Sequence, residues 1–113
     1  MSTFKTINPA TEEVIDEYKL MPKDKVLDAA RNSHVAFQEW KQFDISERAD
    51  YFRRLAQVLR NNKEKYSKLM TLEMGKPIKQ SLTEIEKCAW GAEVYADNAA
   101  KWLEEETVHA DGK

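Results

Sequence analysis

The sequence predicts a mainly α-helical fold with a β-hairpin at its N-terminus. Apolar residues recur every three or four positions through most of the chain, and only the first 20 residues and the C-terminal tail lack this period. Three glycines and three prolines mark the boundaries between long periodic segments. The 113 residues, 42% hydrophobic and 34% charged, contain enough apolar material for one core. We therefore expect one domain, or part of a larger domain.

Residues 3–20 predict two short strands joined as a hairpin. Apolar residues flank a break at residues 8–11, where Pro9 sets φ for a turn and where Asn8 and Thr11 can bond to nearby backbone. An isolated hairpin is marginally stable in water, so this one needs a surface on which to pack.

A first amphipathic helix is predicted over residues 22–42. Pro22 suits a first helical turn because its fixed φ is already helical. The apolar residues behind it follow a spacing of three to four: Val26, Ala29, Ala30, Ala36, Phe37 and Trp40.

A second helix is predicted over residues 45–74. Asp44 and Glu47 have the spacing of a capping box, so the helix should begin at Ile45. Asn61-Asn62 suggests an interruption within it, and Gly75 is placed to end it in a left-handed conformation.

A third helix is predicted over residues 79–106, because proline keeps the residue before Pro77 extended. Its apolar stripe contains several small residues, including Ala92, Ala96 and Ala99, which would allow close approach of another helix or self-association.

Composition argues against several classes of protein. Eighteen basic and 20 acidic residues leave a net charge of -2, which does not favour nucleic-acid binding. The single Cys88 excludes an internal disulfide framework, and two histidines make a zinc cage improbable. The same cysteine usage fits a reducing, cytoplasmic setting. No secretion signal or apolar stretch of about 20 residues is present, so secretion and membrane insertion are unsupported.

No residue is predicted to be catalytic. Cys88 has no histidine nearby in the sequence and falls on an apolar stripe, so we interpret it as a small core residue. We interpret His34 and His109 as surface or packing residues, and residues 104–106 as a solvated acidic helix end rather than a metal site. The three tryptophans are assigned to core and edge packing rather than to a base-stacking platform: Trp40, Trp90 and Trp102.

Five segments resemble the NAD(P)-dependent aldehyde dehydrogenase superfamily, in the order of that family. Residues 6–11 read TINPAT, as at its opening, and residues 36–40 and 46–59 resemble two of its helices. Residues 71–78, TLEMGKPI, resemble its T.E.GKP signature, which is the most specific match. Residues 84–99 look closest to the semialdehyde-oxidising branch, especially succinate-semialdehyde dehydrogenases.

The resemblance implies that residues 1–113 are a single incomplete domain, an N-terminal fragment that flanks the cofactor-binding domain of the α/β aldehyde dehydrogenase fold. The whole enzyme would oxidise an aldehyde, by resemblance succinate semialdehyde, to its carboxylic acid with NAD or NADP. In the family a cysteine thiolate attacks the aldehyde and a glutamate activates water, but those residues and the cofactor loops lie downstream of the matched part. No catalytic or cofactor-binding residue is therefore assigned.

The resemblance also carries one possible ligand site and one departure. Some members hold a monovalent cation between backbone carbonyls of the opening strand and an acidic side chain; by position these are Thr6, Ile7 and Glu84. An exposed carboxylate favoured by the helix dipole is the alternative for Glu84. The family usually has glycine where this chain has Glu12, so a backbone with positive φ there would be strained.

Two hypotheses follow. In the first, the fragment is structural and inactive, and its partners are the remainder of an aldehyde dehydrogenase chain and further copies in a homo-oligomer. In the second, the chain is an autonomous helical module for protein interaction or oligomerisation. Neither hypothesis involves nucleic acid or a membrane.

Overall fold

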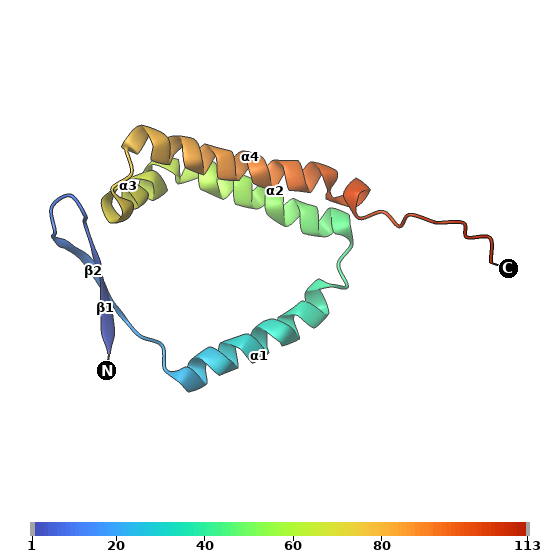
Figure 1. Cartoon of the computed structure of the whole chain (residues 1–113), viewed down its shortest axis with the longest axis horizontal. Helices are drawn as coiled ribbons and strands as arrows, with labels where there is room; N and C mark the ends of the chain where they lie inside the picture. The colour runs from blue at the N-terminus through green and yellow to red at the C-terminus, as the bar shows by residue number, and fades with distance from the viewer. Residues whose placement is uncertain (1, 113) are drawn as a thin grey trace.

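The computed structural model describes residues 2–112 as a β-hairpin followed by four helices (Figure 1). The elements follow in this order: β1 (Thr3–Ile7), β2 (Val14–Lys19), α1 (Lys23–Trp40), α2 (Ile45–Asn61), α3 (Lys63–Met74) and α4 (Ile78–Trp102). The predicted fold class, mainly α with an N-terminal hairpin, is confirmed.

The strands β1 and β2 pair antiparallel, from Thr3 opposite Lys19 to Ile7 opposite Val14, with an irregularity after Thr6. In the turn between them, the Asn8 side chain accepts a hydrogen bond from the Ala10 N–H at 2.9 Å, as expected for this residue type. Glu12 has φ of 62°, so the departure from glycine does fall at a left-handed position.

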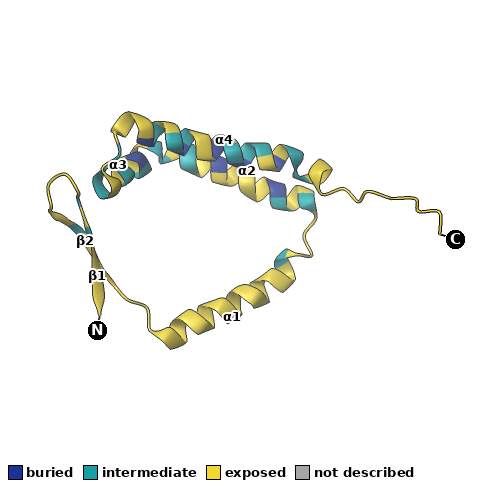
Figure 2. Ribbon diagram, viewed as in Figure 1, coloured by how far each residue is buried: buried dark blue, intermediate teal, exposed yellow. Residues whose placement is uncertain are grey.

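The helix α1 is shorter than predicted and contacts α2 near its C-terminal end, through Trp40. Pro22 is its N-cap rather than its first residue, and it ends at Trp40. None of its residues is buried, and Figure 2 shows it exposed along its length except at its C-terminal end. Its apolar stripe is open to solvent: Phe37 is 52% exposed and Val26 is 49% exposed.

The segment predicted as a helix over 45–74 with an interruption at Asn61-Asn62 is two helices, α2 and α3, which meet at Asn62, so the predicted interruption is confirmed. The Asn62 side chain donates to the Val58 carbonyl at 2.9 Å, and this local bond competes with continuation of the helix. At the start of α2, Glu47 accepts from the Asp44 N–H at 3.1 Å, which confirms the capping interaction. At the end of α3, Gly75 adopts φ of 68°, the predicted left-handed stop.

The last helix, α4, begins at Ile78 and ends at Trp102, four residues before the predicted end. Residues 104–106 are three consecutive glutamates, and negative charge at a helix C-terminus opposes the helix dipole. This unfavourable interaction is the physical reason for the early end.

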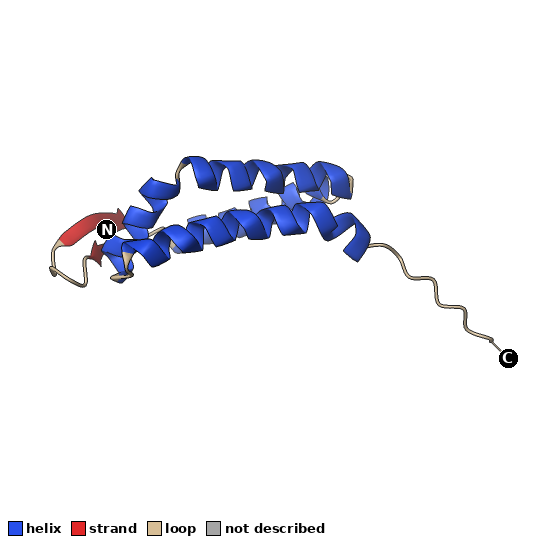
Figure 3. Cartoon of the chain, turned by 90° about the horizontal axis from the view of Figure 1, so that it is seen from above, coloured by secondary structure: helices blue, strands red, loops and turns tan. Residues whose placement is uncertain are grey.

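The core lies between α2 and α4, which run side by side in Figures 1 and 3. Ala56 on α2 and Ala89 on α4 are fully buried, with Ala92 beside them and Leu59 partly buried against them. Small residues let the two backbones approach closely, as the alanines of the stripe predicted. Because α2 covers Ala92 and Ala96, the prediction that this stripe serves self-association is wrong.

The chain as a whole is open rather than compact. Its radius of gyration is 20.4 Å, whereas a compact chain of this length would have a radius of about 13 Å. The helix α1 stands apart from α2 and α4, and residues 104–112 extend away from the helices (Figure 1). No helix in residues 2–112 has the length and apolar character that crossing a bilayer requires.

Candidate functional site

The residues predicted to hold a cation lie on different elements. Thr6 and Ile7 are on β1, which contacts α3, and Glu84 is in the second turn of α4. The Glu84 carboxylate already accepts a hydrogen bond from the Lys76 ammonium. A metal ion at Glu84 would therefore have to displace Lys76, and the cation site stays a prediction.

Another acid, Glu73 near the end of α3, acts on the hairpin through its charge. The pKa of Tyr18 on β2 is raised, chiefly by the negative charge of Asp16 and by burial, and the charge of Glu73 contributes as well. The hydroxyl of Thr6 is buried and has no hydrogen-bond partner in the described structure. Glu73 belongs to the TLEMGKPI segment, which the sequence marked as a family motif. The sequence analysis did not predict that this segment lies near the hairpin.

Cys88 is exposed, so its assignment to the core is wrong. It is displaced from the buried stripe of α4, in which Ile85, Ala89 and Ala92 face α2. The open depression around its thiol is lined by Lys76, Lys79, Gln80, Thr83, Glu84 and Lys87. No histidine is among these residues, and the one carboxylate, Glu84, is paired with the Lys76 ammonium.

The two histidines contribute no site. His34 is exposed on α1 and shares a hydrogen bond with Gln38 at 3.2 Å, and His109 is exposed in the C-terminal segment. Over residues 2–112, no group of three or more His, Cys, Asp or Glu side chains is arranged to hold a metal ion.

The tryptophans are less buried than the packing role predicted. Trp90 is 60% exposed and Trp102 is 56% exposed, so neither lies in the core, but Trp102 packs edge-on against Tyr95 with a centroid distance of 5.9 Å, as edge packing predicted. Trp40 is partly buried, and its ring contacts the edge of Tyr51 with a centroid distance of 4.9 Å. This contact joins the end of α1 to the start of α2.

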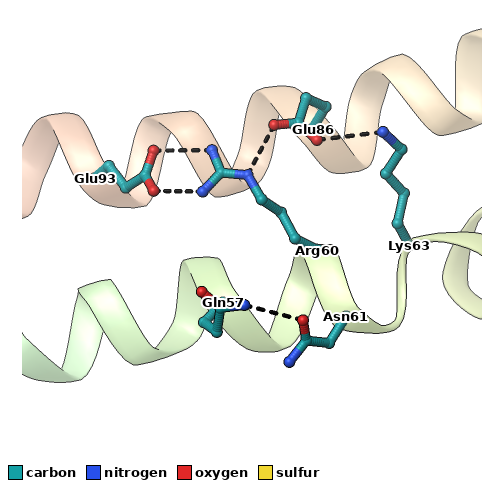
Figure 4. Close-up of polar contacts among 6 residues, drawn as sticks. All are labelled: Gln57, Arg60, Asn61, Lys63, Glu86 and Glu93. Carbon is teal, nitrogen blue, oxygen red and sulfur yellow. Dashed lines mark hydrogen bonds and ion pairs between the residues drawn. The ribbon is translucent and has the colours of Figure 1, made fainter.

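A polar clamp, made of Arg60, Lys63, Glu86 and Glu93, joins α2 and α3 to α4 (Figure 4). The Arg60 guanidinium donates through Nε to Glu86 at 2.8 Å and through both terminal nitrogens to Glu93, one of them at 2.8 Å. Lys63 donates to the other oxygen of Glu86 at 3.3 Å.

Hydrogen bonds from Arg60 lower the pKa of Glu86 and of Glu93, and Lys63 lowers that of Glu86 further. The same bonds to Glu93 and Glu86 raise the pKa of Arg60. These shifts favour the charged forms of Arg60, Glu86 and Glu93, so the clamp holds the helices together through ion pairs. Sequence reasoning missed it because its partners are 23 to 33 positions apart, beyond any local spacing rule.

An apolar groove lies where the ends of α1 and α4 meet the start of α2. Its volume is about 210 Å³, and its lining residues are Trp40, Ile45, Arg48, Ala49, Phe52, Tyr95, Ala96, Ala99 and Leu103. We call it the Arg48 groove, because Arg48 brings the one charged side chain to its wall. The Nε of Arg48 is buried and makes no hydrogen bond within the described structure.

Comparison with known proteins gives a consistent result. The chain matches the profile named Aldehyde dehydrogenase family over residues 1–113. It is 35% identical over 106 residues to the probable succinate-semialdehyde dehydrogenase [NADP(+)] of Synechocystis, covering 94% of this chain and 23% of that protein. It is 36% identical over 99 residues to the mitochondrial succinate-semialdehyde dehydrogenase of Arabidopsis thaliana, covering 88% of this chain and 19% of that protein.

Solved structures agree. Succinic semialdehyde dehydrogenase from Streptococcus pyogenes, in complex with NADP+, has a TM-score of 0.89 and 30% identity over 96% of this chain and 24% of its own. Lactaldehyde dehydrogenase from Escherichia coli has a TM-score of 0.92 and 25% identity over 100% of this chain and 24% of its own. The chain therefore spans about a quarter of the length of the proteins that it matches.

Proposed function

The chain belongs to the aldehyde dehydrogenase family, and we propose that residues 1–113 supply the N-terminal, non-catalytic part of an NAD(P)-dependent enzyme that oxidises an aldehyde to its carboxylic acid. The observation that carries this proposal is the match of the whole chain, in its open arrangement, to solved aldehyde dehydrogenases. In that assembly the chain is an incomplete domain that flanks the cofactor-binding domain.

Succinate semialdehyde is the proposed substrate. The Synechocystis and Arabidopsis relatives carry its name, and so does the Streptococcus pyogenes structure. NADP is the favoured cofactor over NAD, because the name of the Synechocystis relative includes it and the Streptococcus pyogenes enzyme was solved in complex with it. The cofactor would supply the hydride acceptor, and no residue of this chain is assigned to bind it.

The role of the chain itself is structural. Its single thiol, Cys88, has no histidine beside it, and the nearby Glu84 carboxylate is paired with Lys76, so the chain alone should not form the covalent intermediate on which the family's chemistry depends. The open faces of α1 and of the hairpin would instead be buried against the remainder of an aldehyde dehydrogenase and, in a homo-oligomer, against further copies.

Location stays a prediction. A cytoplasmic setting was expected from the single cysteine, and one relative carries the word mitochondrial in its name.

An assay with succinate semialdehyde and NADP+ tests the proposal. The 113-residue chain alone should produce no NADPH, and neither should the later three quarters of the Synechocystis relative alone. Mixing the two should restore NADPH production. Turnover by the chain alone would contradict its non-catalytic role, and an inactive, non-associating mixture would contradict the structural role.

The second candidate, an autonomous helical interaction module, is favoured by one observation: α2, α3 and α4 already share a core and a polar clamp within this chain. A single cooperative unfolding transition, with a heat capacity change appropriate to 113 residues, would support it. A broad transition with binding of a hydrophobic dye would oppose it.

A further inference from the structure

The face of α4 that points away from α2 carries two lysines beside an exposed tryptophan. Lys79, Lys87 and Trp90 are exposed, whereas Ile85 and Ala89 on the opposite side of the helix are buried. We call the three exposed residues the Lys79 patch. An open depression of about 600 Å³ lies along the patch and is lined by all three of its residues. This volume is within the range of sites that bind small molecules.

The positive charge of the Lys79 patch is not neutralised within the chain. The one carboxylate in the depression is Glu86, which already accepts hydrogen bonds from Arg60 and Lys63 (Figure 4). Within residues 2–112, neither Lys79 nor Lys87 forms a salt bridge. Because the whole chain has a net charge of -2, this local excess of positive charge indicates where an anion would bind.

The dimensions of the Lys79 patch match a single nucleotide. Lys79 and Lys87 are eight positions apart, which is about 12 Å along the helix axis. Trp90 follows Lys87 by less than one turn and is 60% exposed, so its ring can stack on an aromatic base. The next charged residues along α4, Glu93 and Asp97, are acidic, so the positive patch ends at Trp90. A longer polyanion would find no further cation in that direction.

From this arrangement we propose that the Lys79 patch binds a nucleoside triphosphate. The ammonium groups of Lys79 and Lys87 donate hydrogen bonds to the phosphate oxygens, and the base stacks on the indole ring of Trp90. Hydrogen bonds between charged groups are stronger than neutral ones, and salt screens them at an exposed site. The site is independent of the proposed function, because it uses only side chains of α4.

Isothermal titration calorimetry of the 113-residue chain with ATP tests the site. The titration is done at low ionic strength and without Mg²⁺, so that the triphosphate keeps its full charge. ATP should bind at one site per chain, and added salt should weaken the binding. Inorganic triphosphate lacks the base and should bind at least about fivefold more weakly, the loss expected for one stacking contact. Adenosine lacks the phosphates and should show no binding.

Two sets of variants separate the charge from the stacking. The double variant Lys79→Gln and Lys87→Gln should weaken ATP binding by about tenfold or more, because two charged donors are lost. Trp90→Ala should weaken it by about fivefold or more. Lys101→Gln and Trp102→Ala change the same residue types on α4 outside the patch, and both should bind like the wild type. Circular dichroism of each variant establishes that its helices are intact.

Three results would overturn the inference. The first is no binding of ATP to the wild-type chain, and the second is wild-type affinity in both the double lysine variant and Trp90→Ala. The third is tighter binding of a single-stranded oligonucleotide than of ATP, which would make nucleic acid the occupant. Each of these results leaves the proposed function intact, because aldehyde oxidation is measured in a separate assay.

Discussion

Two regions of the chain differ in burial: one is made of α2, α3 and α4, and the other of the β-hairpin and α1. Both regions have a regular pattern of apolar residues in the sequence. Ala56 and Ala89 are fully buried between α2 and α4, whereas α1 buries none of its 18 residues. Apolar residues repeat at helical spacing in α1 as they do in α2 and α4. The difference shows that an amphipathic pattern predicts a face that requires a cover, and does not identify what covers it.

The two regions meet at one close contact. A Cβ added to Gly75, at the end of α3, would lie 3.1 Å from the Pro9 ring in the hairpin turn. The strand β1 contacts α3 as well. The hairpin therefore contacts the packed region at Gly75. The helix α1 contacts the packed region through the ring pair Trp40 and Tyr51.

The largest effect should come from the same substitution made in each region. Ala89→Leu overfills the α2–α4 contact and should lower the free energy of unfolding by about 1–3 kcal/mol. Ala30→Leu, on the exposed α1, should change it by less than about 0.5 kcal/mol. Urea unfolding followed by circular dichroism measures both.

Equal effects of the two substitutions would show that α1 is packed in solution as tightly as α4. That result would remove the contrast between the regions.

The contact between the regions is tested by Gly75→Ala. The positive φ of 68° and the nearby Pro9 ring should make this change cost about 1–2 kcal/mol and speed amide hydrogen exchange in β1. The matched control is Gly91→Ala within α4, where an added Cβ meets no atom within 4 Å. It should stabilise the chain by about 0.5–1 kcal/mol, because alanine favours a helix. A loss of stability in both variants would contradict the specific role of Gly75 in the contact between the two regions.

Acid should weaken the packed region through the polar clamp. Glu86 and Glu93 have lowered pKa values in the folded chain, because Arg60 donates hydrogen bonds to them. They bind protons less readily in the folded chain than in the unfolded chain. Their contribution to the free energy of unfolding is therefore complete above the ordinary glutamate pKa of about 4.3. It should be lost as the pH falls through the lowered values.

Arg60→Met serves as the control for this acid effect. The variant should be less stable than the wild type at pH 7, and the difference between the two should shrink towards zero in acid, as measured by urea unfolding at each pH. A constant difference at every pH would show that the clamp makes no net contribution.

The smallest effect should be a gain in the hairpin. Glu12→Gly relieves the strain of φ 62° and should stabilise the turn by a net of about 0.5–1 kcal/mol. Amide hydrogen exchange in β1 and β2 measures it. Glu13→Gly removes a neighbouring glutamate whose φ is not positive, and it should make exchange faster rather than slower. Slower amide hydrogen exchange in both variants would contradict the conclusion that the backbone is strained at Glu12.

Local features were predictable from the sequence because short-range chemistry sets them. The capping interaction of Asp44 and Glu47, the stop at Gly75 and the strained position of Glu12 each depend on a few adjacent residues. The family followed from motif spacing across the whole chain, and the comparisons confirm it.

Long-range features required the tertiary structure. Cys88 and Trp90 belong to a helix whose pattern is apolar on more than one side, and only the position of α2 shows which side is buried. The same holds for Arg48, whose buried Nε without a hydrogen-bond partner is visible only in the tertiary structure. Sequence by itself determined the helix ends that carry a capping signal, the start after Asp44 and the stop at Gly75, because hydrogen bonds over three or four residues control them. Tertiary structure alone decided which faces meet, because burial depends on contacts between residues far apart in the chain.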